Sequence, residues 1–537
     1  MVGFASPFGP SDGQNRDLIL EAIRTWASQN LLPWSAAWDT FFNALIPQLT
    51  TYINAKAVAG YSWRLTSSII ATTGNSVAVF AVDPNRPLTI NDLVSDASFP
   101  IRYGIVTSVI DDSHANVSYV GVLGNTGGVV VSIIAGKSVA IDNTDPARPI
   151  ITSIKPLGVN VKDYGAIGDG VADDTTAITN ALAAVYTLGG IVYMPSGVYK
   201  ITSTINVPNQ VIIQGSTRDS SVINIAHPTA DGLHLANGSG VEAIKFISTI
   251  ARTGGTNVTL LGNTSYVNNC NFSNYFVAVT AGIAGTACIN PRITNSGFGS
   301  PAIGPGSGGI VLVYTAGAVI DNLQMLGPGT GTQPDFGLKV MQGDALNAVN
   351  CNITRHGRAL YITPATGLVV TAHTFANCFF DSANGSASAV ISPSGSGIYH
   401  TKFTNCWFGI AAQQGCVIDG TTYAVDGTSF SGCEFTTNTG EGLLITGTHA
   451  INTEITGGWS GGNTGNGISI SNGASYFTIT GHRVGPVAGG TGNATGILVA
   501  ASASDNYVIV GNNLRGNTTS LTDSGTGINK VVANNLI

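Results

Sequence analysis

Hydrophobic and polar residues follow different periods in successive parts of the chain. Over residues 15–60 the apolar positions recur every three or four residues, which predicts two helices, the second kinked at Pro47. Over residues 61–140 they alternate with period two, in runs such as "SVAVFAV" and "YGIVTSVI", which predicts a small β-domain. We therefore expect a helical segment over residues 1–60 and a β-domain with its linker over residues 61–150.

From about residue 210 onward the alternation is organised into a repeat. Cys351, Cys378, Cys406 and Cys433 follow one another at spacings of 27, 28 and 27 residues, in the contexts "AVNCNI", "FANCFF", "FTNCWF" and "FSGCEF". Helical repeats need two amphipathic helices per unit, and leucine-rich repeats need a Leu-rich pattern, whereas these units alternate and are broken by Asn and Gly. Each unit is therefore predicted to be one coil of a parallel β-helix. Asn and Gly would hold its tight turns, and the cysteines would be small packing residues.

Composition narrows the class of protein. Only 9% of the residues are charged and 69 are Gly, so Ser, Thr, Asn and Gly keep the surface neutral. A net charge of −7 without a basic patch argues against nucleic acid as a partner. We expect neither membrane insertion nor a secretory signal, because the chain has no run of 18 apolar residues and no basic segment ahead of an apolar one at its N-terminus. The odd number of seven Cys favours synthesis in a reducing compartment.

Three segments carry a family resemblance. "VKDYGAIGDGVADDTTAITNAL" at 161–182 is followed by "GGIVYMPSGVYKIT" at 189–202 and by "VIIQG" at 211–215. In this order and spacing they resemble the N-terminal coil module of the pectate-lyase-like superfamily, which occurs in polygalacturonase-like enzymes and in bacteriophage tailspikes. The resemblance is closest over residues 159–216. It implies a mainly β protein with a right-handed parallel β-helix over residues 151–537, in about a dozen coils of about 27 residues.

The acidic residues of this module are interpreted as architectural rather than catalytic. Asp173 or Asp174 is expected to cap a helix over residues 175–186. That helix would then cover the open end of the coil stack, whose backbone edge would otherwise invite pairing.

A column of aromatic and charged residues is the candidate site. When the coils are aligned on the cysteines, the residue after each cysteine falls on one outward column: Phe379, Trp407, Glu434, Trp459, Arg483 and Asn513. Exposed indoles beside a carboxylate and a guanidinium suit a polysaccharide, so Trp407, Trp459 and Arg483 are the predicted glycan-binding residues. The alternative is that this column packs against a neighbouring subunit.

Catalysis would need two carboxyl groups about 5–9 Å apart. Glu434 could pair with Glu441, Glu454 or Asp381, and the sequence does not choose among them. The motifs of polygalacturonase-like enzymes (Asn-Thr-Asp, Asp-Asp, Gly-His-Gly and Arg-Ile-Lys) are missing from the coil region, where "GHRVG" at 481–485 is a partial echo. A glycoside hydrolase, a polysaccharide lyase and a protein without enzymatic activity therefore all stay open.

Two further expectations concern ligands. Arg355, His356 and Arg358, in "TRHGRAL", could bind an anionic sugar or form a solvated turn. No ligand spacing indicates a metal site, and we expect no cofactor.

The tailspike resemblance implies a homotrimeric virion protein of a phage tail, synthesised in the host cytoplasm. It would attach to tail or baseplate proteins through residues 1–150 and would recognise, or also depolymerise, a host surface polysaccharide. The alternative is a non-enzymatic structural virion fibre or adhesin in which the β-helix is a rigid spacer. The two hypotheses differ in whether the column from Trp407 to Trp459 is open to solvent in the assembled oligomer.

Overall fold

The computed structural model describes the backbone of six strands before residue 155, and then residues 157–537 apart from 186–188, 300, 330, 488–489 and 503. The chain divides into two compact units, Met1–Ile154 and Lys155–Ile537. The strands of the first unit are β1 (Leu65–Thr66), β2 (Leu93–Asp96), β3 (Arg102–Asp111) and β4 (His114–Val122), which form one sheet, and the pair β5 (Ser138–Asp142) and β6 (Ile150–Ile154). Strands β1 to β5 lie within residues 61–150, the range expected to form a β-domain with its linker, whereas β6 has only Ile150 in that range. The helices predicted over residues 1–60 lie outside the described residues.

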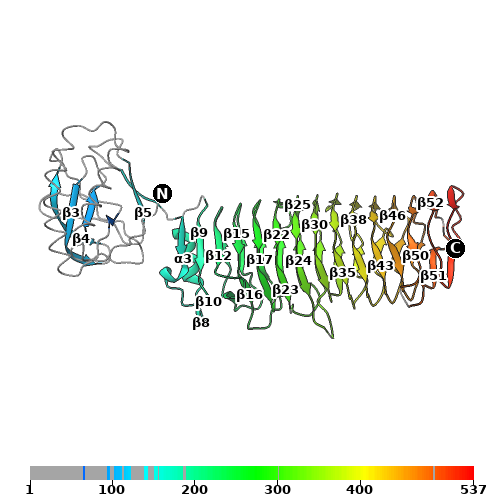
Figure 1. Ribbon diagram of the computed structural model, residues 1–537, viewed down its shortest axis with the longest axis horizontal. Coiled ribbons are helices and arrows are strands. Elements are labelled where there is room, and N and C mark those ends of the chain that lie inside the picture. Colours follow the sequence, from blue (N-terminus) through cyan, green and yellow to red (C-terminus); the bar gives the residue numbers. More distant parts are fainter. Residues whose placement is uncertain are drawn as a thin grey trace, which may run out of the picture. The chain divides into compact units, whose positions relative to one another are not determined.

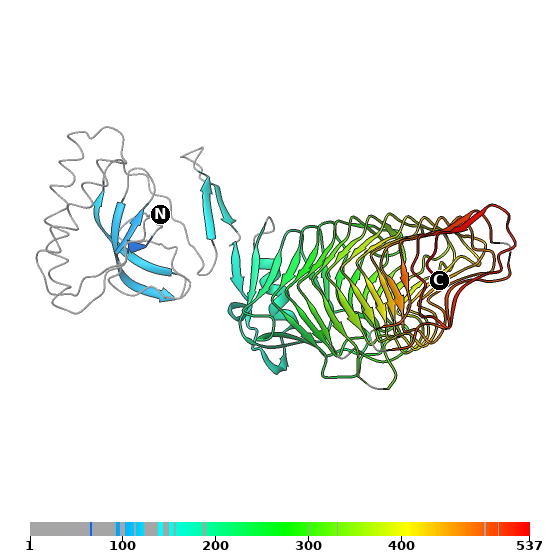
Figure 2. The same cartoon turned by 45° about the vertical axis from the view of Figure 1, so that its right-hand side comes forward.

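The second unit is a parallel β-helix, as predicted (Figures 1 and 2). Its strands form sheets of 13, 13, 15 and seven members, here called sheets 1, 2, 3 and 4, and neighbouring strands pair in parallel. Each coil of the central part passes through sheets 3, 1, 2 and 4 in this order. Sheets 1 and 2 therefore count about 13 coils, close to the dozen expected.

The strands of the four sheets have the following bounds. Sheet 1 consists of β8 (Asp169–Asp173), β10 (Gly197–Ile201), β13 (Ser221–Ile225), β16 (Lys245–Ile247), β19 (Asn271–Ser273), β23 (Gly297–Gly299), β27 (Gln324–Leu326), β31 (Asn352–Thr354), β35 (Phe379–Asp381), β39 (Trp407–Gly409), β43 (Glu434–Thr436), β47 (Trp459–Gly461) and β50 (Arg483–Val484). Sheet 2 consists of β11 (Ile205–Val207), β14 (Leu233–Leu235), β17 (Thr256–Leu260), β20 (Val277–Ala281), β24 (Gly308–Leu312), β28 (Phe336–Val340), β32 (Arg358–Ile362), β36 (Ala389–Ile391), β40 (Cys416–Asp419), β44 (Leu443–Thr446), β48 (Ile468–Ser471), β51 (Thr495–Val499) and β53 (Thr519–Asp523). Sheet 3 consists of β7 (Gly158–Asn160), β9 (Ile191–Met194), β12 (Ile212–Gly215), β15 (Gly240–Glu242), β18 (Tyr266–Asn268), β22 (Arg292–Thr294), β26 (Val319–Asp321), β30 (Asn347–Val349), β34 (Thr374–Ala376), β38 (Lys402–Thr404), β42 (Ser429–Ser431), β46 (Glu454–Thr456), β49 (Thr478–Thr480), β52 (Tyr507–Val510) and β54 (Lys530–Ala533). Sheet 4 consists of β21 (Cys288–Ile289), β25 (Thr315–Ala316), β29 (Gly343–Asp344), β33 (Val370–Thr371), β37 (Ile398–Tyr399), β41 (Val425–Asp426) and β45 (Ala450–Ile451).

A single residue with positive φ turns the chain from sheet 3 into sheet 1 in coil after coil. These residues are Ala243, Asn269, Asn295, Asn322, Asn350, Asn377, Asn405, Gly432, Gly457, Gly481, Gly511 and Asn534. Gly and Asn predominate because they enter the left-handed region at the least cost. The predicted Asn/Gly turns are therefore confirmed.

The repeated cysteines directly follow these turns and are buried inside the coils. Each thiol donates a hydrogen bond to the carbonyl oxygen two residues earlier, at Sγ–O distances from 3.2 Å in Cys351 to 3.6 Å in Cys433. Their predicted role as small packing residues is confirmed.

Aromatic rings fill the coils in two ladders: Phe375, Phe403 and Phe430 in one, and Phe380, Phe408 and Phe435 in the other. Ring centroids within a ladder lie 4.9–5.3 Å apart. This spacing is close to the rise of about 4.8 Å between paired strands, so each coil supplies one ring per ladder. Burying a Phe side chain contributes about 1.5–3 kcal/mol, and the two ladders therefore couple the stability of these three coils.

A short helix covers the first coil. Helix α3 (Thr175–Ala184) buries Ala177, Ile178, Ala181 and Leu182 and contacts β7, β11 and the 3₁₀ helix η1 (Val161–Tyr164). Asp173 accepts a hydrogen bond from the Thr175 backbone N–H at 3.0 Å. Asp174, although it is the N-cap residue, instead accepts from the backbone N–H groups of Ile167 at 2.6 Å and Gly168 at 3.1 Å. Of the two acids considered, Asp173 is thus the one bonded to the helix, and both have local structural contacts.

Among the helices that the structure describes, none is long and apolar enough to cross a membrane.

Candidate functional site

The structure brings the predicted residues of sheet 1 into one column. Trp407 pairs in register with Glu434, Glu434 with Trp459, and Trp459 with Arg483. Phe379 extends the column before Trp407, and Asn513 extends it after Arg483 through an isolated bridge. We call Trp407, Glu434, Trp459 and Arg483 the tryptophan column. Their register agrees with the period of the sequence, and their role remains a prediction.

Both indoles lie along their own strands, over a glycine two residues further on. A Cβ atom added to Gly409 would stand 2.2 Å from Nε1 of Trp407, and one added to Gly461 would stand 2.6 Å from Nε1 of Trp459. These glycines therefore make room for the rings on the outer face of sheet 1. Because each indole is half-buried, one part of it packs on the sheet and the rest stays accessible in this chain.

Aromatic and charged neighbours extend this surface in both directions. The ring of Phe379 is 51% exposed and stacks with Trp407, with ring centroids 6.4 Å apart. The guanidinium carbon of Arg483 lies 4.8 Å from the ring centroid of Trp459, at cation–π distance. Arg483 also donates to the carbonyl oxygen of Pro486 at 3.2 Å. The column thus has a ring at one end and an oriented cation at the other.

The carboxyl groups named from the sequence occupy different surroundings. Glu434 is half-buried between the two Trp residues, and its carboxylate makes no hydrogen bond or ion pair with any residue that the structure describes. Glu441 follows β43 and accepts a hydrogen bond from Nε2 of Gln414 at 3.0 Å. Glu454 is exposed on β46 of sheet 3, so it does not share the outer face of sheet 1 with Glu434.

Asp381 is a carboxyl group of the predicted pairs whose surroundings shift its pKa. It stands on β35, in register with Gly409, in the outward column beside the tryptophan column. Burial raises the pKa of Asp381, and hydrogen bonds from Ser382 and from Trp407 offset part of this increase. A carboxyl group that holds its proton to higher pH has the property required of a general acid.

The three residues of "TRHGRAL" do not form one exposed cluster. His356 is completely buried, and burial lowers its pKa to about 4. Its Nδ1 lies 2.8 Å from the carbonyl oxygen of Thr354. Arg358 forms an ion pair with Asp335, and Arg355 is the exposed residue with positive φ at the turn. The hypothesis that all three bind one anionic sugar is therefore wrong for His356, which faces the coil interior because it follows that turn.

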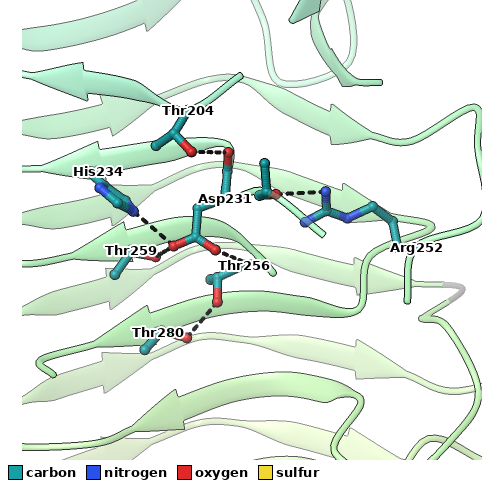
Figure 3. A network of polar contacts seen from close by, with 8 residues as sticks. Thr204, Asp231, His234, Arg252, Thr256, Thr259 and Thr280 are labelled. Atoms are coloured by element: carbon teal, nitrogen blue, oxygen red, sulfur yellow. Dashed lines mark hydrogen bonds and ion pairs between the residues drawn. The ribbon is translucent and has the colours of Figure 1, made fainter. Parts of the chain in front are cut away.

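Sequence reasoning missed a polar network around Asp231 on sheet 2 (Figure 3). The carboxylate of Asp231 binds Nε2 of His234 at 2.8 Å, the backbone N–H of Thr256 at 2.7 Å and the hydroxyl of Thr259 at 3.0 Å. The carbonyl oxygen of Asp231 accepts from the hydroxyl of Thr204 at 2.9 Å. The residue therefore connects three coils.

Arg252 completes this network from the loop before β17. It is 4% exposed, and its Nη1 donates to the carbonyl oxygens of His227 and Ala230 at 2.5 and 2.8 Å. Since the Asp231 carboxylate is occupied by partners within the chain, we interpret the network as structural: it stabilises the stacking of neighbouring coils. In the sequence, Asp231 and His234 stand in "DGLHLANG". The apolar alternation of this segment predicts a strand, but it does not reveal the polar network, because the other partners of Asp231 lie on other coils.

Comparison with known proteins gives partial matches. Residues 158–379 match the family model described as rhamnogalacturonase A/epimerase, pectate lyase-like. Over 88 residues the chain is 36% identical to the pre-neck appendage protein of Bacillus phage B103, which is 16% of this chain and 10% of that protein. The chain therefore spans about a tenth of the length of this relative.

Among solved structures, the A-module of mannuronan C-5 epimerase AlgE4 from Azotobacter vinelandii aligns with a TM-score of 0.48 at 15% identity, over 70% of this chain and 99% of that one. The Dettilon tailspike protein aligns with a TM-score of 0.42 at 12% identity, over 70% of this chain and 68% of that one.

Proposed function

We propose that this chain, a tailspike-like parallel β-helix protein with a pectate-lyase-like domain over residues 158–379, is a phage tail appendage that binds a host surface polysaccharide at the tryptophan column. The observation that carries the proposal is the in-register placement of two indoles, a carboxylate and a guanidinium on the outer face of sheet 1. The sequence similarity to a phage pre-neck appendage protein supports the assignment to a phage tail.

The spacing of the column suits a chain of sugars. Successive coils rise by about 4.8 Å, so Trp407 and Trp459, two coils apart, present their rings about 10 Å from each other. A sugar unit of about 5 Å would then meet one outward side chain per coil. The indoles would contact the C–H faces of the sugars, while Glu434 and Arg483 would bind hydroxyl or acidic groups.

Depolymerisation is a second activity that this surface could support. Asp381 and Glu434 lie on strands two coils apart in sheet 1, and Asp381 is in register with Gly409 whereas Glu434 is in register with Trp407. Their backbones are therefore more than about 10 Å apart, and their side chains would have to point toward each other to bring the carboxyl groups within the roughly 5–9 Å that catalysis needs. The raised pKa of Asp381 favours it as the general acid, and Glu434, free of partners among the described residues, is suited to act as base or nucleophile.

Two parts of the proposal concern assembly. We assign attachment to the virion to residues 1–150. We expect a homotrimer, because a chain with only 9% charged residues has little charge to oppose association, and the tailspike resemblance points to threefold symmetry. Light scattering at micromolar concentration should give three times the chain mass, and a monomeric mass would contradict this part.

The test of the binding proposal is the double variant Trp407→Ala, Trp459→Ala, assayed against a panel of host capsules and lipopolysaccharides. Each stacking contact contributes about 0.5–1.5 kcal/mol beyond burial, so binding should weaken at least about tenfold. Tyr423→Ala removes an aromatic side chain that is 37% exposed on a loop after β40, and it should leave binding unchanged. If the double variant folds and binds as well as the wild type, the site lies elsewhere.

Glu434→Gln separates binding from turnover in the same assay. Loss of chain shortening with binding retained would assign Glu434 a catalytic role. Unchanged binding without any chain shortening in the wild type would favour the alternative function, a non-enzymatic fibre or adhesin with the β-helix as spacer.

A further inference from the structure

A second group of aromatic and cationic side chains lies on the outer face of sheet 2, apart from the tryptophan column. Phe336 and Lys339 of β28 pair in register with Arg358 and Tyr361 of β32. We call these four residues the cationic shelf. It belongs to earlier coils than the tryptophan column and to a different sheet.

An apolar layer outside the coil core supports the shelf. Phe336 is 1% exposed and packs with Val277 and Val311 in a cluster separate from the main core. Its ring lies over Gly308 of the preceding coil, where an added Cβ would stand 2.3 Å from Cε2 of Phe336. This is the arrangement seen under Trp407 and Trp459, in which a glycine makes room for a ring on the outer face.

Two cations converge on the rings of the shelf. The ammonium of Lys339 lies 5.6 Å from the ring centroids of both Phe336 and Tyr361, and the guanidinium carbon of Arg358 lies 4.0 Å from that of Tyr361. Cation–π attraction holds such groups in place without neutralising them. The shelf is therefore a fixed cationic surface on an apolar base.

Of the two cations, Arg358 has a carboxylate partner and Lys339 has none among the described residues. Arg358 forms an ion pair with Asp335, in which both side chains are largely buried, at 26% and 22% exposure. Lys339 is half-buried, and the described residues offer its ammonium no carboxylate or carbonyl oxygen within bonding distance. Among the described lysines, Lys162, Lys200 and Lys530 donate to a carbonyl or carboxylate oxygen, whereas Lys245 and Lys402 resemble Lys339 in having no such partner. One positive charge of the shelf is thus left without a counter-ion.

We propose that the cationic shelf binds an acidic sugar unit, with its anionic group on the Lys339 ammonium and its C–H face against Tyr361. A charge-assisted hydrogen bond from a partly desolvated ammonium is about twice as strong as a neutral one, which favours an anionic over a neutral sugar. This inference deepens the proposed function, on which it rests, by naming the polysaccharide as anionic. It also assigns to sheet 2 a binding site independent of sheet 1.

The experiment measures the binding of the full-length protein to glucuronic acid oligosaccharides, to their carboxyl-reduced neutral counterparts and to sulfated glucose oligosaccharides of the same length. The wild type should bind the acidic oligosaccharides at least about tenfold more tightly than the neutral ones. The sulfated arm distinguishes a site for carboxylates from one that accepts any anionic substituent. Raising the salt concentration should weaken acidic binding.

Lys339→Met removes the charge and keeps the length of the side chain. It should lower affinity for the acidic oligosaccharides about tenfold and leave the neutral ones unaffected, while Lys339→Arg should retain most of the binding. Lys402→Met, on sheet 3, changes the net charge equally at an exposed position and should have no effect. Acidic binding by Lys339→Met as tight as that of wild type would overturn the proposal. So would a changed oligomeric mass in light scattering, which would make the shelf a contact between subunits.

The double variant Trp407→Ala, Trp459→Ala separates this proposal from the proposed function. If the tryptophan column is not a glycan site, this variant still binds acidic oligosaccharides in a way that depends on Lys339. If the shelf is not a site, the double variant loses binding and Lys339→Met does not.

Discussion

Three buried histidines should make the β-helix sensitive to mild acid. Burial lowers the pKa of His356, of His373 and of His482 to about 4, from an ordinary value of 6.5. Between these values the unfolded chain binds protons that the folded chain excludes, so stability is complete above about pH 6.5 and declines as the pH falls toward 4. The pKa values of the unfolded and the folded chain differ by about 2.5 units, and each unit corresponds to about 1.36 kcal/mol. Each histidine should therefore lower the free energy of unfolding by about 3 kcal/mol when the pH falls from about 6.5 to about 4.

His482 offers the sharpest test, because the equivalent position in the next two coils is occupied by asparagine, which can therefore replace it. Its backbone N–H donates to Oδ1 of Asn512, and the backbone N–H of Asn512 donates to Oδ1 of Asn535, so asparagine occupies the same position in the next two coils. His482→Asn therefore removes one titrating group and preserves the type of side chain that this column accepts.

The measurement is the midpoint of denaturant unfolding between pH 7.5 and pH 4.5, for wild type and variant. If the three histidines contribute equally, the loss of stability across this range should be smaller in His482→Asn by about a third. His400→Asn is the matched control. His400 is exposed at a residue with positive φ, a conformation that Asn452 adopts two coils later, and its replacement should leave the pH dependence unchanged. A pH dependence in His482→Asn as steep as that of the wild type would refute the reasoning.

Two further variants test contacts in the first coils. Asp174→Ala should lower the free energy of unfolding by about 1–3 kcal/mol, because it removes a buried carboxylate and leaves the partly buried N–H groups of Ile167 and Gly168 without their acceptor; unchanged melting would contradict this. Asp231→Asn should cost a similar amount at neutral pH, since three donors lose a carboxylate. The hydrogen bond with His234 helps to keep the pKa of Asp231 below its ordinary value despite burial. The difference in stability from wild type should therefore be complete above about pH 4 and should disappear only as the pH falls through the lowered pKa of the folded state. A difference that persists after the carboxyl group has been protonated would contradict the role of the carboxylate.

The period of the sequence predicted the columns where coils have equal length. Because paired strands of a β-helix are in register, spacings of 27 and 28 residues sufficed to align Trp407 with Glu434. An alignment of the coils at this spacing could not predict the cationic shelf. Lys339 and Tyr361 are paired although only 22 residues separate them (361 minus 339), since the loop before β32 is short.

The burial of individual polar side chains and the polar contacts between coils could not be predicted from the sequence either. Nothing in "TRHGRAL" distinguishes the interior His356 from its charged neighbours, because the side-chain direction depends on one residue with positive φ, Arg355. Likewise Asp231 finds its partners on adjacent coils, at positions that apolar alternation does not specify.

The parallel sheets also determine how the second unit should respond to mechanical force. Hydrogen bonds between strands run along the axis of the coils, so tension along that axis loads them directly, and the boundaries between coils act as links in series. Four sheets share the load from β21 to β45, but fewer do so nearer the ends, where sheet 1 finishes in the two-residue strand β50 and two isolated bridges. Under force the last coils should therefore detach first and the central coils last.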